Sequence, residues 1–84
     1  MFKAKVYVTL KAGVLDPQGK AVKGALMTMG YDETEEVRIG KYIELELNTE
    51  NKAVAEERVK EMCEKLLANT VIEDYRFDIE EVAK

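Results

Sequence analysis

The sequence predicts a small single-domain α+β protein, with an antiparallel sheet and two helices on one of its faces. Three stretches alternate apolar and polar residues with the period of a half-buried strand. Two further stretches repeat apolar residues at spacings of three and four, as amphipathic helices do. The chain has 84 residues, of which 46% are hydrophobic, and no internal repeat or linker is visible, so we expect one domain over residues 1–84.

The first strand and the first helix carry the clearest signals. Every second residue of the segment 2–10 is apolar, namely Phe2, Ala4, Val6, Val8 and Leu10. Asp16 followed by Pro17 predicts a helix start, because aspartate accepts hydrogen bonds from free amides and proline at the first helical position loses none. Gly30 is placed to end this helix in a left-handed conformation.

Residues 34–48 alternate in the same way but leave two topologies open. A two-residue hairpin at Gly40 and Lys41 would turn glutamates onto the core face, which is untenable. Either a three-residue loop with a glycine bulge reverses the chain, or residues 34–48 form one long strand bent at Gly40. We favour the long strand.

The second half of the chain predicts a helix and a last strand. The helix covers about residues 52–68, with Asn69 as its C-terminal cap. Its apolar stripe consists of Ala55, Val59, Met62, Cys63, Leu66 and Leu67. Alternation over residues 72–81 predicts the strand. This order of elements resembles a ferredoxin-like split unit if the long strand folds back on itself.

If the long strand does not fold back, the chain requires a second copy. A bent strand of about 14 residues would span roughly 45 Å, which is too long for so small a domain to cover alone. Its far half would then pair with the other copy. The sequence therefore predicts an intertwined homodimer, and further pairing into a tetramer stays open.

Charge and composition exclude several classes of function. The net charge of −4 argues against nucleic acid as a partner. No stretch approaches the roughly 18 apolar residues of a membrane span, and the first residues lack the apolar run of a signal peptide, so we expect a cytoplasmic protein. Without histidine, the usual nucleophile pairs and zinc sites cannot form. We expect Cys63 to be a core thiol, and we expect no catalytic residue, metal or cofactor on this chain.

Three groups of polar residues could carry chemistry, and each has a plainer interpretation. Glu33, Glu35 and Glu36 could form an acidic cluster, although solvated charge on a polar link is commoner. Residues 15–19 set free amides at a helix start, where an anion could bind, but capping alone accounts for them. An outward set of aromatic and basic side chains fits a protein interface as well as plain exposure. This set comprises Tyr7, Arg38, Lys41, Tyr42 and Arg76.

Four stretches together resemble one protein family. They are KVYVTLK at 5–11, VLDPQG at 14–19, VRIGKY at 37–42 and MCEKLLANTVIEDY at 62–75. The LDPQG and RIGK blocks in this order are highly specific. Over nearly its whole length the chain resembles PurS, the family of small subunits of phosphoribosylformylglycinamidine synthase (FGAM synthase).

The resemblance implies a non-catalytic, structural subunit of a ligase complex in the fourth step of purine biosynthesis. In this amidotransferase family, a glutaminase subunit releases ammonia and a synthetase subunit uses ATP to incorporate it. A homodimer of the small subunit bridges the two and assists ammonia transfer. The implied partners are therefore a second copy and the two larger subunits.

The resemblance carries over no catalytic residue, but its matching stretches contain candidates for contact with partners. These candidates are Arg38, Lys41, Tyr42, Asn69, Glu73, Asp74 and Tyr75. A strand bend and a helix cap would explain the same residues equally well. The alternative function is a stand-alone regulatory dimer that binds an amino acid or a nucleotide at its subunit interface.

Overall fold

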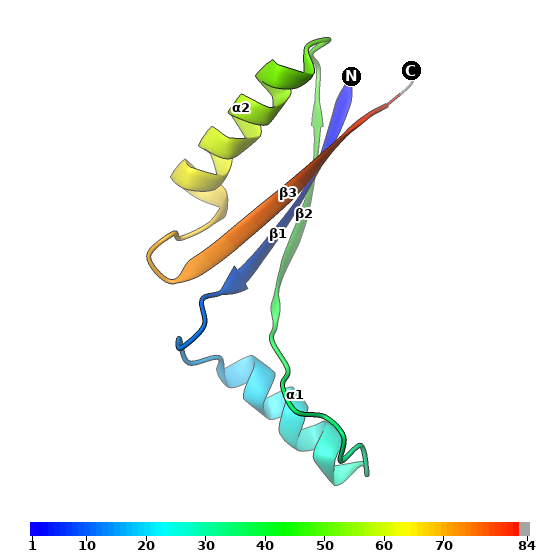
Figure 1. Ribbon diagram of the computed structural model, residues 1–84, viewed down its shortest axis with the longest axis vertical. Coiled ribbons are helices and arrows are strands. Elements are labelled where there is room, and N and C mark those ends of the chain that lie inside the picture. The colour runs from blue at the N-terminus through cyan, green and yellow to red at the C-terminus, as the bar shows by residue number, and fades with distance from the viewer. Residues whose placement is uncertain (83–84) are drawn as a thin grey trace.

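The computed structural model describes residues 1–82 and contains one antiparallel sheet with the strand order β2-β1-β3 (Figure 1). The elements are β1 (Phe2–Leu10), α1 (Pro17–Thr28), β2 (Gly40–Leu47), α2 (Lys52–Met62), the π-helical turn η1 (Cys63–Leu67) and β3 (Glu73–Glu81). The predicted α+β class with a small antiparallel sheet is confirmed. None of the helices in this part of the chain is long and apolar enough to cross a membrane.

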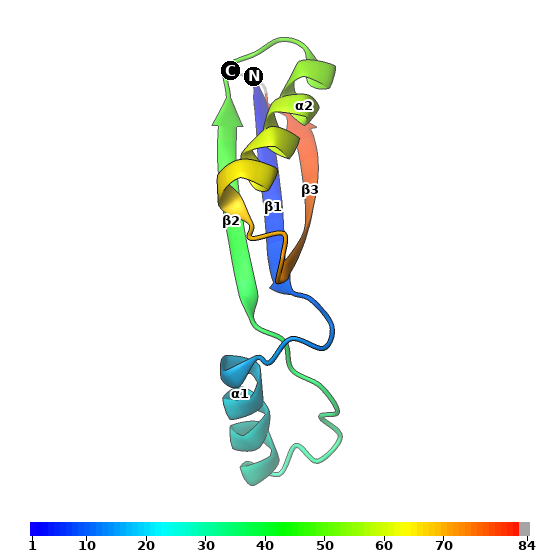
Figure 2. The same cartoon turned by 90° about the vertical axis from the view of Figure 1, so that its left-hand side faces the viewer.

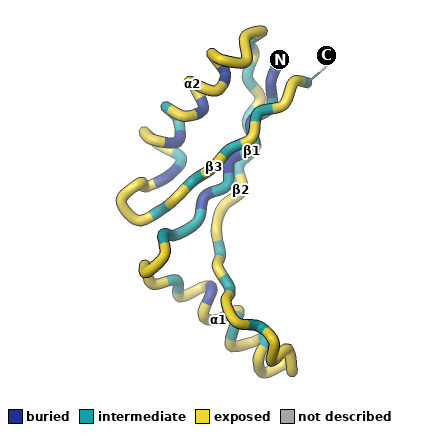
Figure 3. Tube along the Cα trace, in the orientation of Figure 1, coloured by how far each residue is buried: buried dark blue, intermediate teal, exposed yellow. Residues whose placement is uncertain are grey.

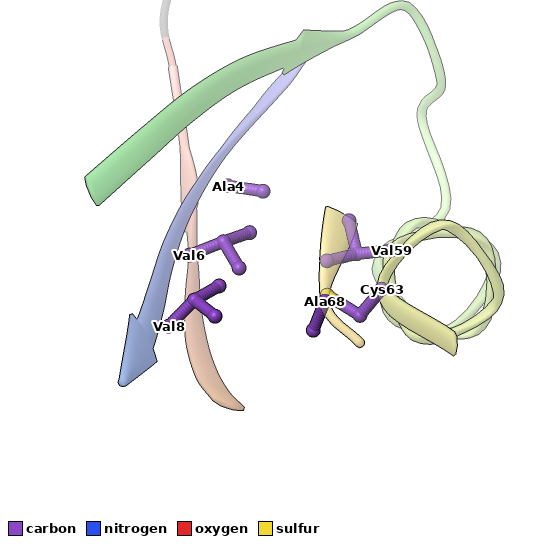
Figure 4. Close-up of a cluster of buried hydrophobic side chains, with 6 residues drawn as sticks. All are labelled: Ala4, Val6, Val8, Val59, Cys63 and Ala68. Carbon is purple, nitrogen blue, oxygen red and sulfur yellow. The ribbon is translucent and has the colours of Figure 1, made fainter. Parts of the chain in front are cut away.

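The core lies between the central strand and α2. Residues of β1 alternate between buried and half-buried, as the sequence pattern predicts. Val6 and Val8 are fully buried against Val59 and Cys63 of the second helical segment (Figure 4). Cys63 is therefore a core residue, as predicted. Figure 3 shows buried residues along β1 and α2, and also at the start of α1, where Gly19 is buried.

The prediction that two helices share one face of the sheet is wrong for α1. Figures 1 and 2 show α2 covering the sheet, whereas α1 projects beyond the end of the strands. A three-stranded sheet is roughly 10 Å from first strand to last, which is about the width of one helix. Because α2 fills that face, the sheet of one chain leaves no room for a second helix.

The ends of α1 follow the sequence. Asp16 caps its first turn and Pro17 is the first helical residue. Gly30 has a φ of 96°, a conformation that glycine adopts without steric cost. The amphipathic pattern predicts a buried apolar side, but the apolar residues of this helix are mostly exposed, since no other helix or strand of residues 1–82 covers it.

The chain does not reverse at Gly40, so the hairpin alternative is excluded. Strand β2 pairs with β1 from Gly40 to Leu47 and continues the direction of the preceding segment. Residues 34–39 are not assigned to a strand, although we expected the strand to begin at 34. Strand β1 ends at Leu10, so residues 34–39 have no neighbouring strand within the part of the chain that the structure describes.

The second helical segment also ends differently from the prediction. Asn51 caps its start, and regular α-helix stops at Met62. The chain then widens into η1, in which the Ala68 amide donates to the Cys63 carbonyl. Ala68 is extended and serves as the C-terminal cap, so the prediction of Asn69 as the cap is wrong. Asn69 instead begins the turn that leads into β3.

Candidate functional site

Antiparallel pairing brings the seven predicted contact residues to one end of the sheet. Thr9 of the central strand pairs with Gly40 on one side and with Asp74 on the other. The starts of β2 and β3 therefore flank the end of β1, and the segment after η1 leads into the same place. Two family-like stretches that are far apart in the sequence thus form one neighbourhood.

Two hydrogen-bonded residues, Asp16 and Arg38, connect the segments before and after α1 at this end of the sheet. The Asp16 carboxylate accepts from the Gly19 amide at 2.9 Å and from the Ile39 amide at 3.0 Å. The Arg38 guanidinium donates to the Leu10 carbonyl. A Cβ atom on Gly19 would overlap the Val37 carbonyl oxygen, so the close passage of the 37–39 segment requires glycine there. Arg38 therefore already has a hydrogen-bond partner within its own chain.

The hydrogen bonds of the Asp16 carboxylate predict that the protein loses stability in acid. The backbone amide of Ile39, and after it that of Gly19, lowers the pKa of Asp16 below its ordinary 3.8. The folded form thus favours the ionised carboxylate of Asp16. Its contribution to the free energy of unfolding is fully present above pH 3.8, the ordinary pKa. It is lost as the pH falls through the lowered pKa of the folded state. In urea unfolding between neutral pH and acid, Asp16→Asn should be less stable than wild type at neutral pH, and the difference should shrink in acid.

Glu33→Gln provides the control for this titration, because Glu33 lies on the exposed link and has no hydrogen bond in the described residues. It should leave the acid profile unchanged. If the difference in free energy of unfolding between Asp16→Asn and wild type stays constant with pH, the lowered pKa of Asp16 does not contribute to stability.

Four further candidates also have contacts within the chain. The Lys41 ammonium lies 3.4 Å from the Leu67 carbonyl, where the exposed carbonyls of a helix end favour a cation. The Glu73 carboxylate accepts from the Asn69 amide at 2.7 Å. The Tyr75 hydroxyl donates to Glu64 at 2.7 Å, and this bond, together with desolvation, raises the pKa of Tyr75 to about 12. These contacts account for the turn and the helix end, so a role of these residues with partners stays a prediction.

The remaining two candidates lie on the face of the sheet that is turned away from α2, which we name the open face. In register, its members are Lys3, Lys5, Tyr7 and Thr9 of β1, Tyr42, Glu44 and Glu46 of β2, and Asp74, Arg76, Asp78 and Glu80 of β3. The Tyr42 hydroxyl donates to Glu44 at 2.9 Å. Desolvation and this bond raise the pKa of Tyr42 to about 12, while Tyr42 and then Lys3 lower that of Glu44.

The structure adds an apolar surface that the sequence did not predict. Leu66 is 82% exposed. Leu66 lines a hollow of about 410 Å³ beside the edge strand β2, which we name the edge hollow. Its other lining residues are the apolar Leu45, Met62 and Leu67 and the charged Arg58, Glu61 and Lys65. Leu66 was expected on the buried stripe, but the hydrogen bonds of η1 span one residue more than those of an α-helix, which turns Leu66 outward. No feature of the sequence marks that shift.

Two further hollows lie between the sheet and α1. They have volumes of about 380 and 410 Å³, and both contain Asp16 in their lining. In residues 1–82 no buried side-chain nitrogen or oxygen lacks a hydrogen bond, and no group of three potential metal ligands occurs. Capping therefore accounts for the polar atoms at this helix start.

A small α+β chain with one covered sheet face and an uncovered helix is typical of proteins that work within assemblies. Comparison with known proteins agrees with this class. The sequence model of the PurS family, described as phosphoribosylformylglycinamidine (FGAM) synthase, matches residues 3–81. The chain belongs to the PurS family, whose members are subunits of FGAM synthase in purine biosynthesis.

Individual relatives cover nearly the whole chain. The Bacillus subtilis PurS subunit is 61% identical over 82 residues, which are 98% of this chain and 96% of that protein. The crystal structure of Methanocaldococcus jannaschii PurS matches with a TM-score of 0.88 and 42% identity, covering 99% of this chain and 100% of its own. A chain of the PurLQS structure from Thermotoga maritima matches with a TM-score of 0.86 and 37% identity, covering 94% and 96% respectively.

Proposed function

We propose that this chain works as a homodimer that joins the glutaminase and synthetase subunits of FGAM synthase and assists the passage of ammonia between them. Membership of the PurS family supports the proposal, as does the likeness to a chain of the PurLQS structure. The subunit would contribute by holding two active sites in register, because ammonia must stay confined between its release and its use. The proposal includes a cytoplasmic location and no cofactor on this subunit.

The extended shape of the chain carries the dimer part of the proposal. The Cα radius of gyration is 16.4 Å, whereas a compact chain of this length would have roughly 12 Å. The accessible surface is 6173 Å², against about 5,000 Å² for a compact monomer of this mass. An excess on the order of 1,000 Å² matches the area that one partner buries in a standard protein interface.

Two uncovered surfaces complement each other in such a dimer. The exposed apolar residues of α1 and its end include Val22, Met27 and Met29, the last being 69% exposed. The edge hollow lies beside the unpaired edge of β2. If residues 31–39 of the second copy extended the sheet at that edge, the wider sheet would have room for the second copy's α1. Each copy would then cover the other's exposed helix.

The bridging function predicts a specific dependence on the nitrogen source. Adding the chain to purified glutaminase and synthetase subunits should raise the rate of FGAM formation from glutamine by about tenfold or more. With ammonium chloride as the nitrogen source, the rate should change by less than about twofold, because free ammonia does not depend on register between the two active sites. Both rates are measured on the same reconstituted mixture.

Equal rates from glutamine with and without the chain would contradict the bridge. Calorimetry of the isolated chain with glutamine, ATP and the substrate ribonucleotide addresses the alternative function. A pure bridge binds none of the three, whereas saturable heat with any of them would favour the stand-alone regulatory dimer.

A further inference from the structure

The open face carries an aromatic and cationic centre that the fold itself does not require. The Tyr7 ring lies between the Tyr42 ring, whose centroid is 5.1 Å away, and the Arg76 guanidinium, which lies 3.9 Å above the Tyr7 centroid. The described elements leave this face uncovered, since α2 packs against the opposite one (Figure 2). Tyrosine and arginine are enriched at the energetic centres of protein interfaces.

Charged side chains surround this centre, and their contacts hold it in place. Lys3 pairs with Glu44 at 3.2 Å and Lys5 with Glu80 at 3.5 Å. Arg76 also lies 3.6 Å from Asp78. Side chains that are already held by neighbours lose less conformational entropy when a partner binds. The open face thus has the arrangement of an interface, with an aromatic centre and a polar rim.

The net charge of the open face indicates the chemistry of its partner. Five carboxylates stand against three cations on this face. Glu46 and Asp74 take part in no ion pair within residues 1–82. The excess of negative charge repels nucleic acid and also a second open face, so it disfavours face-to-face stacking of two copies. A protein surface with an excess of lysine and arginine is the complement.

We propose that the open face is the docking surface for a basic patch on one of the two larger subunits, with Tyr7, Tyr42 and Arg76 at its centre. This inference rests on the proposed function but goes beyond it, because it assigns the contact to one face of the sheet. In the proposed dimer, the edge hollow and α1 form the contact between the two copies. The open face stays free in that dimer, so the two associations use separate surfaces.

Four substitutions test the assignment by binding measurements with the dimeric chain and each larger subunit, in the presence of glutamine and ATP. Tyr42→Ser removes the exposed ring and should raise the Kd for one larger subunit about 30-fold. Tyr42→Phe retains the ring and should stay within about threefold of wild type. Glu46→Lys should raise the same Kd about tenfold. Glu57→Lys makes the same change of charge on the exposed side of α2 and should stay within about twofold.

Light scattering on each variant verifies that it is still a dimer. If wild type binds and both Tyr42→Ser and Glu46→Lys bind within twofold of it, the inference is overturned while the proposed function stands. An equal loss for Glu57→Lys would assign the effect to net charge and also overturn it. If Tyr42→Ser changes only the oligomeric state, the face joins copies of this chain. If the wild-type chain binds neither larger subunit, the inference and the proposed function fall together.

Discussion

Replacing Leu66 with aspartate should convert the dimer into a folded monomer. Leu66 is 82% exposed within one chain, so its side chain contributes little to the monomer's own core. In the proposed dimer it is buried by the second copy, and a carboxylate there would have to be desolvated. We expect the dimer Kd to rise about 100-fold or more, as measured by light scattering over a dilution series.

The control places the same charge at the other end of the helix. Val54→Asp changes a 41% exposed residue in the first turn of α2, where a negative charge is compatible with the helix dipole. It should remain dimeric, and circular dichroism should show both variants folded. Leu45 also lines the edge hollow but packs against the core, so a change there would mix folding with association. A Leu66→Asp protein that is still dimeric at about 1 μM would remove the edge hollow from the dimer interface.

Gly40→Ala should destabilise the fold by about 3 kcal/mol, the upper end of the range for overpacked sites. At the first residue of β2, a Cβ atom would overlap the Val8 carbonyl oxygen and also approach the Thr9 side chain at 2.9 Å. The obstacle is backbone of the central strand, which cannot move without disturbing both of its neighbours. Urea unfolding at fixed protein concentration measures the change.

Gly24→Ala is the matched control, since a Cβ atom there meets nothing within 4 Å in residues 1–82 outside the adjoining turns of its own helix. Gly24 lies inside α1, and alanine in a helix interior is favoured over glycine by about 1 kcal/mol. The two alanine substitutions should therefore have opposite signs. Equal, small effects would show that the backbone at Gly40 adjusts freely and would contradict the close approach of β1 and β2.

The sequence predicted the sheet well because its information is local. The alternation in residues 2–10 fixes which side chains face α2, and the Asp16-Pro17 pair fixes where α1 begins. The direction of the chain at Gly40 could also be inferred, because the hairpin alternative would have buried glutamates. Each of these features depends on neighbours within a few residues.

The features that could not be predicted depend on the third dimension. An amphipathic pattern shows that α1 has an apolar side but not which surface covers it, and no other helix or strand among residues 1–82 of one chain does. The outward rotation of Leu66 follows from the extra residue in η1, whose sequence reads as ordinary helix. The sequence also did not show that the seven contact candidates lie close together. That proximity follows from the register of the antiparallel strands, which only the structure gives. The candidates' hydrogen bonds to their own backbone were not predictable.

The single thiol of this protein lies at the centre of its only described core. Cys63 is fully buried between α2 and the sheet, and burial followed by the neighbouring Glu64 charge raises its pKa. A reagent in water can reach the sulfur only when helix and sheet separate. The rate at which a reagent modifies Cys63 therefore reports how often the core opens. A cysteine introduced on the surface can be labelled selectively while the native thiol stays in place, because the native thiol is buried.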